Sequence, residues 1–143
     1  MRYTVATDGS TESDDAVAYA ARHALAVDAV LEVVHVLTPE TELVDGEVVM
    51  SGERAAIERG ERVLDRASER AHEVAADRDG DLTVETQLLT GWPAGAVVDH
   101  AEATGADAIY VGHRGLSAER EQVVGSVAKT VVDKAEVPVT VIR

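Results

Sequence analysis

The sequence of residues 106–115 is ADAIYVGHRG, an apolar run closed by two glycines. The run from Ala106 to Val111 is almost continuously apolar, which is typical of a strand buried on both faces of a parallel sheet. After a glycine-containing loop, Gly125 and Ser126 lead into a helical pattern. A buried strand, a loop and a helix in this order form the repeating unit of α/β domains. This stretch therefore predicts a parallel sheet covered by helices.

The same alternation of short apolar runs and amphipathic stretches extends along the rest of the chain. Strands are predicted at Tyr3–Thr7, Ala29–Leu37, Leu82–Leu89, Ala106–Val111 and Val137–Ile142. Helices are predicted at Ser13–Val27, Glu53–Arg78, Pro93–Gly105 and Ser126–Ala135, and a loop at Thr38–Gly52. This order favours an α/β fold in a single domain spanning residues 1–143, with a doubly wound five-stranded parallel sheet and helices on both faces.

Four single residues refine these predictions. Pro138 cannot donate a hydrogen bond to a neighbouring strand, so the last strand is expected at an edge of the sheet. Ser13 is expected to cap the first helix, and Gly105 to close the third. Trp92 is expected to pack at the start of that third helix.

Charge narrows the classes of partner. The chain has 27 acidic and 13 basic side chains, a net charge of −14, with Lys129 and Lys134 as the only lysines. Such a balance favours an acidic, halophilic-type surface and disfavours both nucleic acid and anionic membranes as partners. It does not exclude a local phosphate site, because at 1 M salt charges are screened beyond about 3 Å.

Two absences from the sequence exclude further classes. The chain has no cysteine, which removes disulfides and thiolate chemistry. No apolar run approaches the roughly 20 residues of a membrane span, and the start of the chain does not resemble a signal peptide. A soluble, cytoplasmic protein is therefore expected.

The loops after the first and fourth strands are the candidate binding segments. An open parallel sheet binds ligands beyond the carboxyl ends of its strands, where the strand order reverses. Asp8 and Gly9 follow the first strand, although an ordinary strand-to-helix turn uses the same residue types. After the fourth strand, Gly112 and Gly115 allow main-chain amides to approach an anion without a Cβ atom in the way.

The start of the last predicted helix adds to the second segment. Gly125 and Ser126 bring a helix N-terminus, with its unpaired amides and partial positive charge, to the same space. The Ser126 hydroxyl can cap this helix or bind a phosphate oxygen. Arg114 can meet a terminal phosphate with two parallel hydrogen bonds. Together these groups favour a phosphate-bearing ligand.

The spacing G-x2-G-x9-G-S after a buried strand resembles the nucleotide-binding pattern of the universal stress protein family. Flanking segments agree with that family along nearly the whole chain: Thr4–Ser10, Val33–Val36, Gly91–Ala94 and Val137–Val141. The resemblance implies a strand order of 3-2-1-4-5 and a homodimer formed through the last strand, Val137 to Ile142. It also implies ATP as the ligand, with AMP and cyclic AMP as open alternatives.

The resemblance also assigns roles to particular residues. It places Thr7 and Asp8 against adenine and ribose, and the Val36 backbone beside the base. The residues that it places around ribose and phosphates are Gly112, Arg114, Gly115, Gly125, Ser126 and Val127. A Mg²⁺ or Mn²⁺ ion is expected on the phosphates, with Asp8 as the one carboxylate that could hold it, through water. His113 departs from the family pattern, which often has a small residue there.

The function expected from this resemblance is that of an ATP-binding, nucleotide-responsive stress or signalling dimer. A slow ATPase or phosphotransfer enzyme is an alternative, but the chain has no Walker A segment, no lysine near the loop and no evident general base. A nucleotide-free, chaperone-like interaction dimer is another alternative. No dedicated catalytic activity is expected.

Overall fold

The computed structural model describes residues 1–37, 41–50, 52–113 and 125–143. Within these residues, the strands are β1 (Arg2–Ala6), β2 (Val30–Val36), β3 (Thr41–Val44), β4 (Glu47–Met50), β5 (Val84–Leu89), β6 (Ala108–Gly112) and β7 (Val139–Ile142). The helices in the same ranges are α1 (Thr11–Val27), α2 (Glu53–Asp77), α3 (Pro93–Ala103) and α4 (Ser126–Lys134). Apart from β3 and β4, every element corresponds to a predicted one, with ends displaced by one or two residues.

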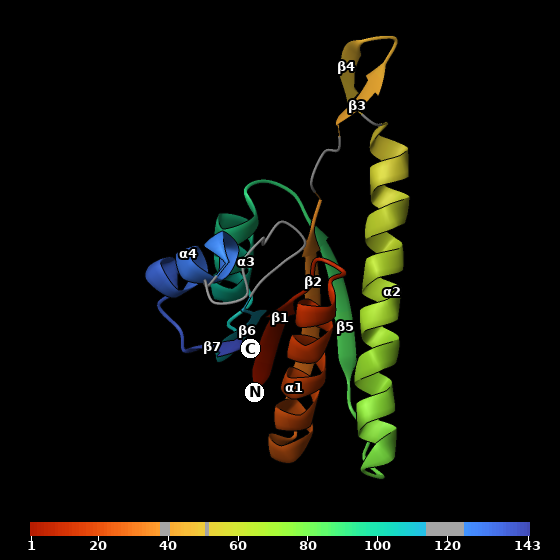
Figure 1. Cartoon of the computed structure of the whole chain (residues 1–143). Coiled ribbons are helices and arrows are strands. Elements are labelled where there is room, and N and C mark those ends of the chain that lie inside the picture. The colour runs from red at the N-terminus through yellow and green to blue at the C-terminus, as the bar shows by residue number, and fades with distance from the viewer. Residues whose placement is uncertain (38–40, 51, 114–124) are drawn as a thin grey trace.

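Five parallel strands form the main sheet in the order β5-β2-β1-β6-β7. In chain order this is 3-2-1-4-5, so the predicted fold class and strand order are confirmed. The strand that follows Pro138 lies at an edge, as predicted, and the Pro138 carbonyl still accepts a hydrogen bond from the Ile109 amide at 2.9 Å. Helices α1 and α2 cover one face of the sheet, and α3 and α4 the other (Figure 1).

Small side chains let the helices approach the sheet closely. Helix α1 buries a stripe of alanines against the sheet, among them Ala16, Ala20 and Ala24, each fully buried. The long α2 contributes Leu64, Ala67, Ala71 and Val74 to the same core. A second core joins β2 and β6 to α3 and α4. Valine and alanine fill both interiors, as a chain without phenylalanine requires.

The ends of two helices test the cap predictions. Helix α1 is capped by Ser10, whose Oγ accepts a hydrogen bond from the Ser13 amide at 3.2 Å, so the prediction of Ser13 as the cap is wrong. The helix begins earlier because Ser10 has the extended backbone that a cap needs. Gly105 follows the C-cap of α3 with a φ of +69°, as predicted. Trp92 is 88 % exposed, so the prediction that it packs there is wrong.

The segment predicted as one loop, 38–52, contains a hairpin instead. Strands β3 and β4 pair antiparallel across Asp45 and Gly46, both of which have positive φ angles. Asp-Gly is a preferred pair for a two-residue hairpin turn, because both positions need that conformation. The hairpin lies beyond the N-terminus of α2, away from the main sheet (Figure 1).

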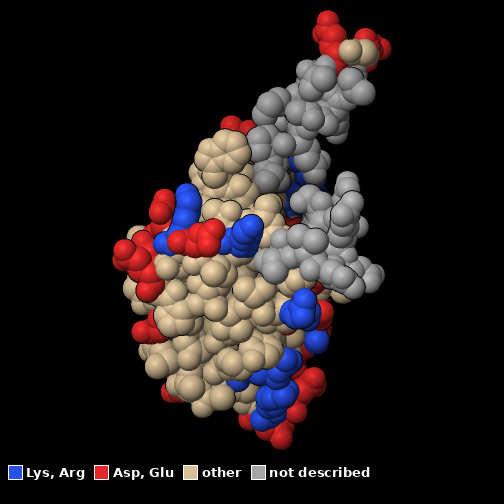
Figure 2. All heavy atoms as spheres, turned by 60° about the vertical axis from the view of Figure 1, so that its left-hand side comes forward, with Lys and Arg blue, Asp and Glu red and all other residues tan. Residues whose placement is uncertain are grey.

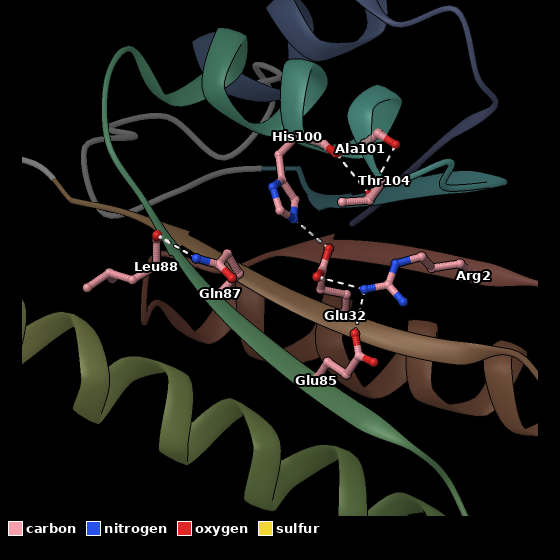
Figure 3. A network of polar contacts seen from close by, with 8 residues as sticks. All are labelled: Arg2, Glu32, Glu85, Gln87, Leu88, His100, Ala101 and Thr104. Atoms are coloured by element: carbon pink, nitrogen blue, oxygen red, sulfur yellow. Dashed lines mark hydrogen bonds and ion pairs between the residues drawn. The ribbon is translucent and has the colours of Figure 1, made fainter.

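A polar cluster lies between the sheet and α3 (Figure 3). Glu32, on β2, is only 5 % exposed. Its carboxylate accepts from the Arg2 guanidinium at 2.9 Å and contacts His100 Nε2 at 2.7 Å. Arg2 also pairs with Glu85 on β5. The cluster ties β1, β2, β5 and α3 together, because a buried carboxylate needs partners for its charge.

Candidate functional site

The carboxyl ends of β1, β2 and β6 meet at one edge of the sheet. Val5 lies opposite Tyr110 on β6, so continuing this register places Thr7 opposite Gly112. On the other side of β1, the Thr7 amide donates to the Val34 carbonyl at 2.9 Å. The chain leaves β1 for β2 on one side and returns to β6 on the other, so the strand order reverses here. Sheets of this kind bind their ligands at such a point.

The turn after β1 is held by its own side chains. Asp8 Oδ1 accepts from the Ser10 amide and from Ser13 Oγ, both at 2.9 Å. Thr7 Oγ1 lies 3.1 Å from Ser13 Oγ and accepts from the Gly9 amide at 3.2 Å. Both predicted ligand residues therefore have a role in fixing the first turn of α1. Their contacts with adenine and ribose stay a prediction.

His35 also belongs to this turn. Its Nδ1 contacts the Thr7 carbonyl oxygen at 2.8 Å, linking β2 to the end of β1. The ring is half-buried, and this contact gives it a structural role. The carbonyl of Thr7, like its hydroxyl, thus already has a partner within the protein. Val36, the last residue of β2, is 7 % exposed, and the place of its backbone beside the base stays a prediction.

Gly112 marks a close approach between β6 and α1. A Cβ atom on this residue would lie 3.0 Å from the Glu12 carbonyl oxygen and 3.2 Å from the Ser13 nitrogen. These are backbone atoms, which cannot move aside as a flexible side chain would. The sequence suggested that Gly112 makes room for an anion. The structure adds that a glycine here lets the first turn of α1 pack against the end of β6.

Helix α4 begins at the same edge of the sheet. Its N-cap residue is Gly125, and within the described residues no side chain caps this end. Ser126 is the first helical residue and is exposed, so the alternative that Ser126 caps the helix is wrong. Val127, the next residue, is 39 % exposed. First-turn amides without a side-chain cap, together with the helix dipole, form an anion-binding end.

His113 is a residue whose position the sequence did not reveal. Its amide donates to the Ile142 carbonyl at 2.6 Å, and its carbonyl accepts from the Gly125 amide at 2.7 Å. The start of α4 is thereby attached to the end of β6, next to Gly112. The side chain is 4 % exposed, and its Nε2 has no partner among the described residues. No sequence pattern signals this role, because it depends on backbone atoms.

Two predicted site residues and the predicted metal ion remain to be placed. Arg114 and Gly115 lie outside the described residues. Among the residues that are described, no group of three or more histidine, aspartate or glutamate side chains is arranged to hold a metal ion. The described part of the chain contains no helix long and apolar enough to cross a membrane.

Comparison with known proteins identifies one family for the whole chain. The model of the universal stress protein family matches residues 1–143. A universal stress protein of Thermus aquaticus is 34 % identical over 142 residues, covering 97 % of this chain and 96 % of the relative. One from Mycolicibacterium smegmatis is 32 % identical over 97 % of this chain, which spans only 47 % of that relative's length.

A solved structure is similar to this fold over the whole chain. The universal stress protein of Archaeoglobus fulgidus in complex with dAMP superposes with a TM-score of 0.74 at 25 % identity. The match covers 100 % of this chain and 98 % of that one.

Proposed function

Since this chain belongs to the universal stress protein family, we propose that it binds an adenine nucleotide, ATP first among them, where β1 and β6 diverge. The observation that carries the proposal is the N-terminus of α4, which no described side chain caps and which His113 holds beside the end of β6. Phosphate oxygens are suitable partners for such a helix end, because its amides and dipole both favour negative charge. The dAMP complex of the Archaeoglobus relative supports an adenine nucleotide as the ligand.

The proposed contacts follow the geometry of the sheet edge. The amides of Ser126 and Val127 would bind phosphate oxygens. Gly125, whose amide donates to the His113 carbonyl, would lie beside them, and Gly112 would keep the first turn of α1 close to the site. Arg114 and Gly115 would complete this side of the ligand, as the family resemblance implies. On the other side, Thr7 and Asp8 would contact ribose and adenine, with the Val36 backbone beside the base. Mg²⁺ or Mn²⁺ would neutralise the phosphates, held to Asp8 through water.

The proposed role is binding and response rather than catalysis. A nucleotide that binds only the folded form stabilises it by mass action, so occupancy would be transmitted as a change in stability of the protein and its assembly. In the turn after β1, Asp8 Oδ1 accepts hydrogen bonds from the Ser10 amide and the Ser13 hydroxyl, which gives this carboxylate a structural role. A nucleotide-responsive stress or signalling protein is the function that fits these features.

A homodimer through β7 is part of the proposal. This strand lies at the edge of the sheet, and its four residues are all half-buried. An unpaired edge strand readily pairs with another chain. On the α3 and α4 side, uncharged residues cover most of the visible described surface, and a row of basic and acidic side chains crosses its upper part (Figure 2). Val127 and Val132 of α4 are 39 % and 50 % exposed. These features support association in that region.

Calorimetric titration with ATP, AMP and cyclic AMP tests the proposal. Ser126→Pro removes one first-turn amide at a position where proline suits a helix start, and the preceding Gly125, with φ −59° and ψ 151°, accommodates it. Ser126→Ala removes only the hydroxyl and serves as the matched control. Hydrogen bonds to charged groups contribute about 1.5–3 kcal/mol. We therefore expect Ser126→Pro to weaken ATP binding by roughly 10- to 100-fold.

Two results would count against the proposal. If wild type and Ser126→Pro bound ATP with equal affinity, the α4 amides would not be part of the binding site. Release of phosphate from ATP at about 1 s⁻¹ or faster would favour the alternative of an enzyme.

A further inference from the structure

A second pocket lies on the opposite side of the sheet from α3 and α4. It has a volume of about 420 Å³ and lies between α1, α2 and the edge strand β7. Three arginines line it, each from a different part of the chain: Arg22 of α1, Arg70 of α2, and Arg143 directly after β7. The volume is within the range of small-molecule sites, roughly 300–1,000 Å³. None of the residues assigned to the nucleotide site lines this pocket.

The charge of this pocket is opposite to that of the molecule. The whole chain carries 27 acidic and 13 basic side chains, whereas three basic side chains and one acidic one, Asp15, line the pocket. Guanidinium groups brought together repel one another, and a bound anion offsets this repulsion. In an acidic protein, such a convergence concentrates anions at one place on the surface.

The guanidinium groups have donors available for a ligand. Arg70 is 3.8 Å from an Asp14 oxygen and 3.7 Å from a Glu73 oxygen, longer than the 2.7–3.2 Å of a good hydrogen bond. Both carboxylates are well exposed, so these pairs contribute little. Arg22 and Arg143 have no ion pair with any described carboxylate. The Arg22 guanidinium instead lies over the Tyr19 ring, 5.5 Å from its centroid.

We propose that this pocket binds a small anion with at least two negative charges, carried by phosphate or carboxylate groups. Arginine recognises both groups through two parallel hydrogen bonds, and a rigid guanidinium loses little freedom in doing so. The stacking of Arg22 on Tyr19 orients one guanidinium before the ligand arrives. Thr140 of β7 supplies a hydroxyl at the wall of the pocket. This site goes beyond the proposed nucleotide function and does not depend on nucleotide binding, although Thr140, Val141 and Ile142 in its wall belong to the strand proposed for the dimer.

The test uses pyrophosphate and citrate as probes, titrated separately into ¹⁵N-labelled protein at constant ionic strength. We expect saturable binding with a Kd below about 1 mM for at least one probe. Amide shifts are expected in residues 15–22 and 140–142. The comparison of the two probes distinguishes a phosphate ligand from a polycarboxylate. The variant Arg22→Gln/Arg70→Gln should bind at least about tenfold more weakly, while the control Arg66→Gln, on the same helix as Arg70, should bind as wild type does.

The Ser126→Pro background separates the two sites. Binding of the probe in this background, with shifts in residues 15–22, supports the pocket whether or not ATP binds elsewhere. Shifts confined to Gly112 and residues 125–127 would overturn the inference, as would equal affinity in Arg22→Gln/Arg70→Gln and wild type. Absence of saturable binding of both probes up to about 10 mM would also overturn it.

Discussion

Replacing Gly112 by alanine tests the close approach on which the nucleotide site depends. The added Cβ atom would lie 3.0 Å from the Glu12 carbonyl oxygen and 3.1 Å from the Glu12 carbonyl carbon. Ordinary contacts of this kind are about 3.4 Å or longer, so the first turn of α1 has to move by a few tenths of an ångström. Adding a methyl group to a tightly packed place costs about 1–3 kcal/mol. Alanine also lowers the conformational entropy of the unfolded chain, which stabilises the folded protein by about 0.4–1 kcal/mol.

The expected net loss in the free energy of unfolding is therefore about 1–2 kcal/mol, or roughly 3–8 °C in Tm for a chain of this length. The displaced turn is linked to Asp8 through the Ser13 hydroxyl, so ATP binding should weaken as well. Gly95→Ala is the matched control. Gly95 lies within helix α3, and among the described residues its Cβ atom would meet only Lys134 Nζ, at 4.0 Å. It should stabilise the protein by about 0.5–1 kcal/mol, because alanine favours a helix interior.

Urea unfolding of the two variants and wild type provides the measurement, with ATP titration of each. The reasoning would be refuted if Gly112→Ala were as stable as Gly95→Ala. A loss of stability in Gly112→Ala with unchanged ATP affinity would confirm the packing and separate it from the binding site.

Three further predictions concern other parts of the molecule. Glu32→Gln should cost about 3 kcal/mol in urea unfolding, because it removes the buried carboxylate that the half-buried Arg2 and His100 share. The control Glu85→Gln, at an exposed partner of the same Arg2, should cost under about 1 kcal/mol, and equal losses would contradict this account. Burial raises the pKa of Tyr110 to about 12, above roughly 10 in the unfolded chain, so stability should fall as pH rises between these values. The stability of Tyr110→Phe should fall less steeply over the same pH range. Parallel stability curves for this variant and wild type would contradict the prediction. Val141→Asp on β7 should give a monomer by light scattering if that strand forms the dimer.

Local patterns predicted most of the architecture. The apolar run of β6 and the alternation around it indicated a parallel sheet, and Pro138 placed the last strand at an edge. The Asp45-Gly46 hairpin was missed, although its turn signal is present in the sequence, because the flanking segment contains Pro39 and several charges. The cap of the first helix was predicted at Ser13 instead of Ser10, because both residues are serines near the first apolar positions of that helix.

Contacts between distant segments account for what the sequence did not show. The packing of Gly112 on Glu12 joins residues a hundred positions apart, and nothing in either local pattern specifies it. The same holds for His113, whose backbone attaches α4 to the sheet, and for the partners of Glu32. The arginines of the second pocket come from three separate elements. The single domain, the cytoplasmic location and the salt-adapted surface stay predictions.

A crystal structure of the chain grown with ATP and Mn²⁺ would test the central claim most directly. The account predicts phosphate oxygens within hydrogen-bond distance of the backbone nitrogens of Ser126 and Val127, with the base beside Val36. An anomalous signal from Mn²⁺ should lie near the phosphates on the Asp8 side. A nucleotide bound elsewhere, the arginine-lined pocket included, or no nucleotide at millimolar ATP, would contradict it.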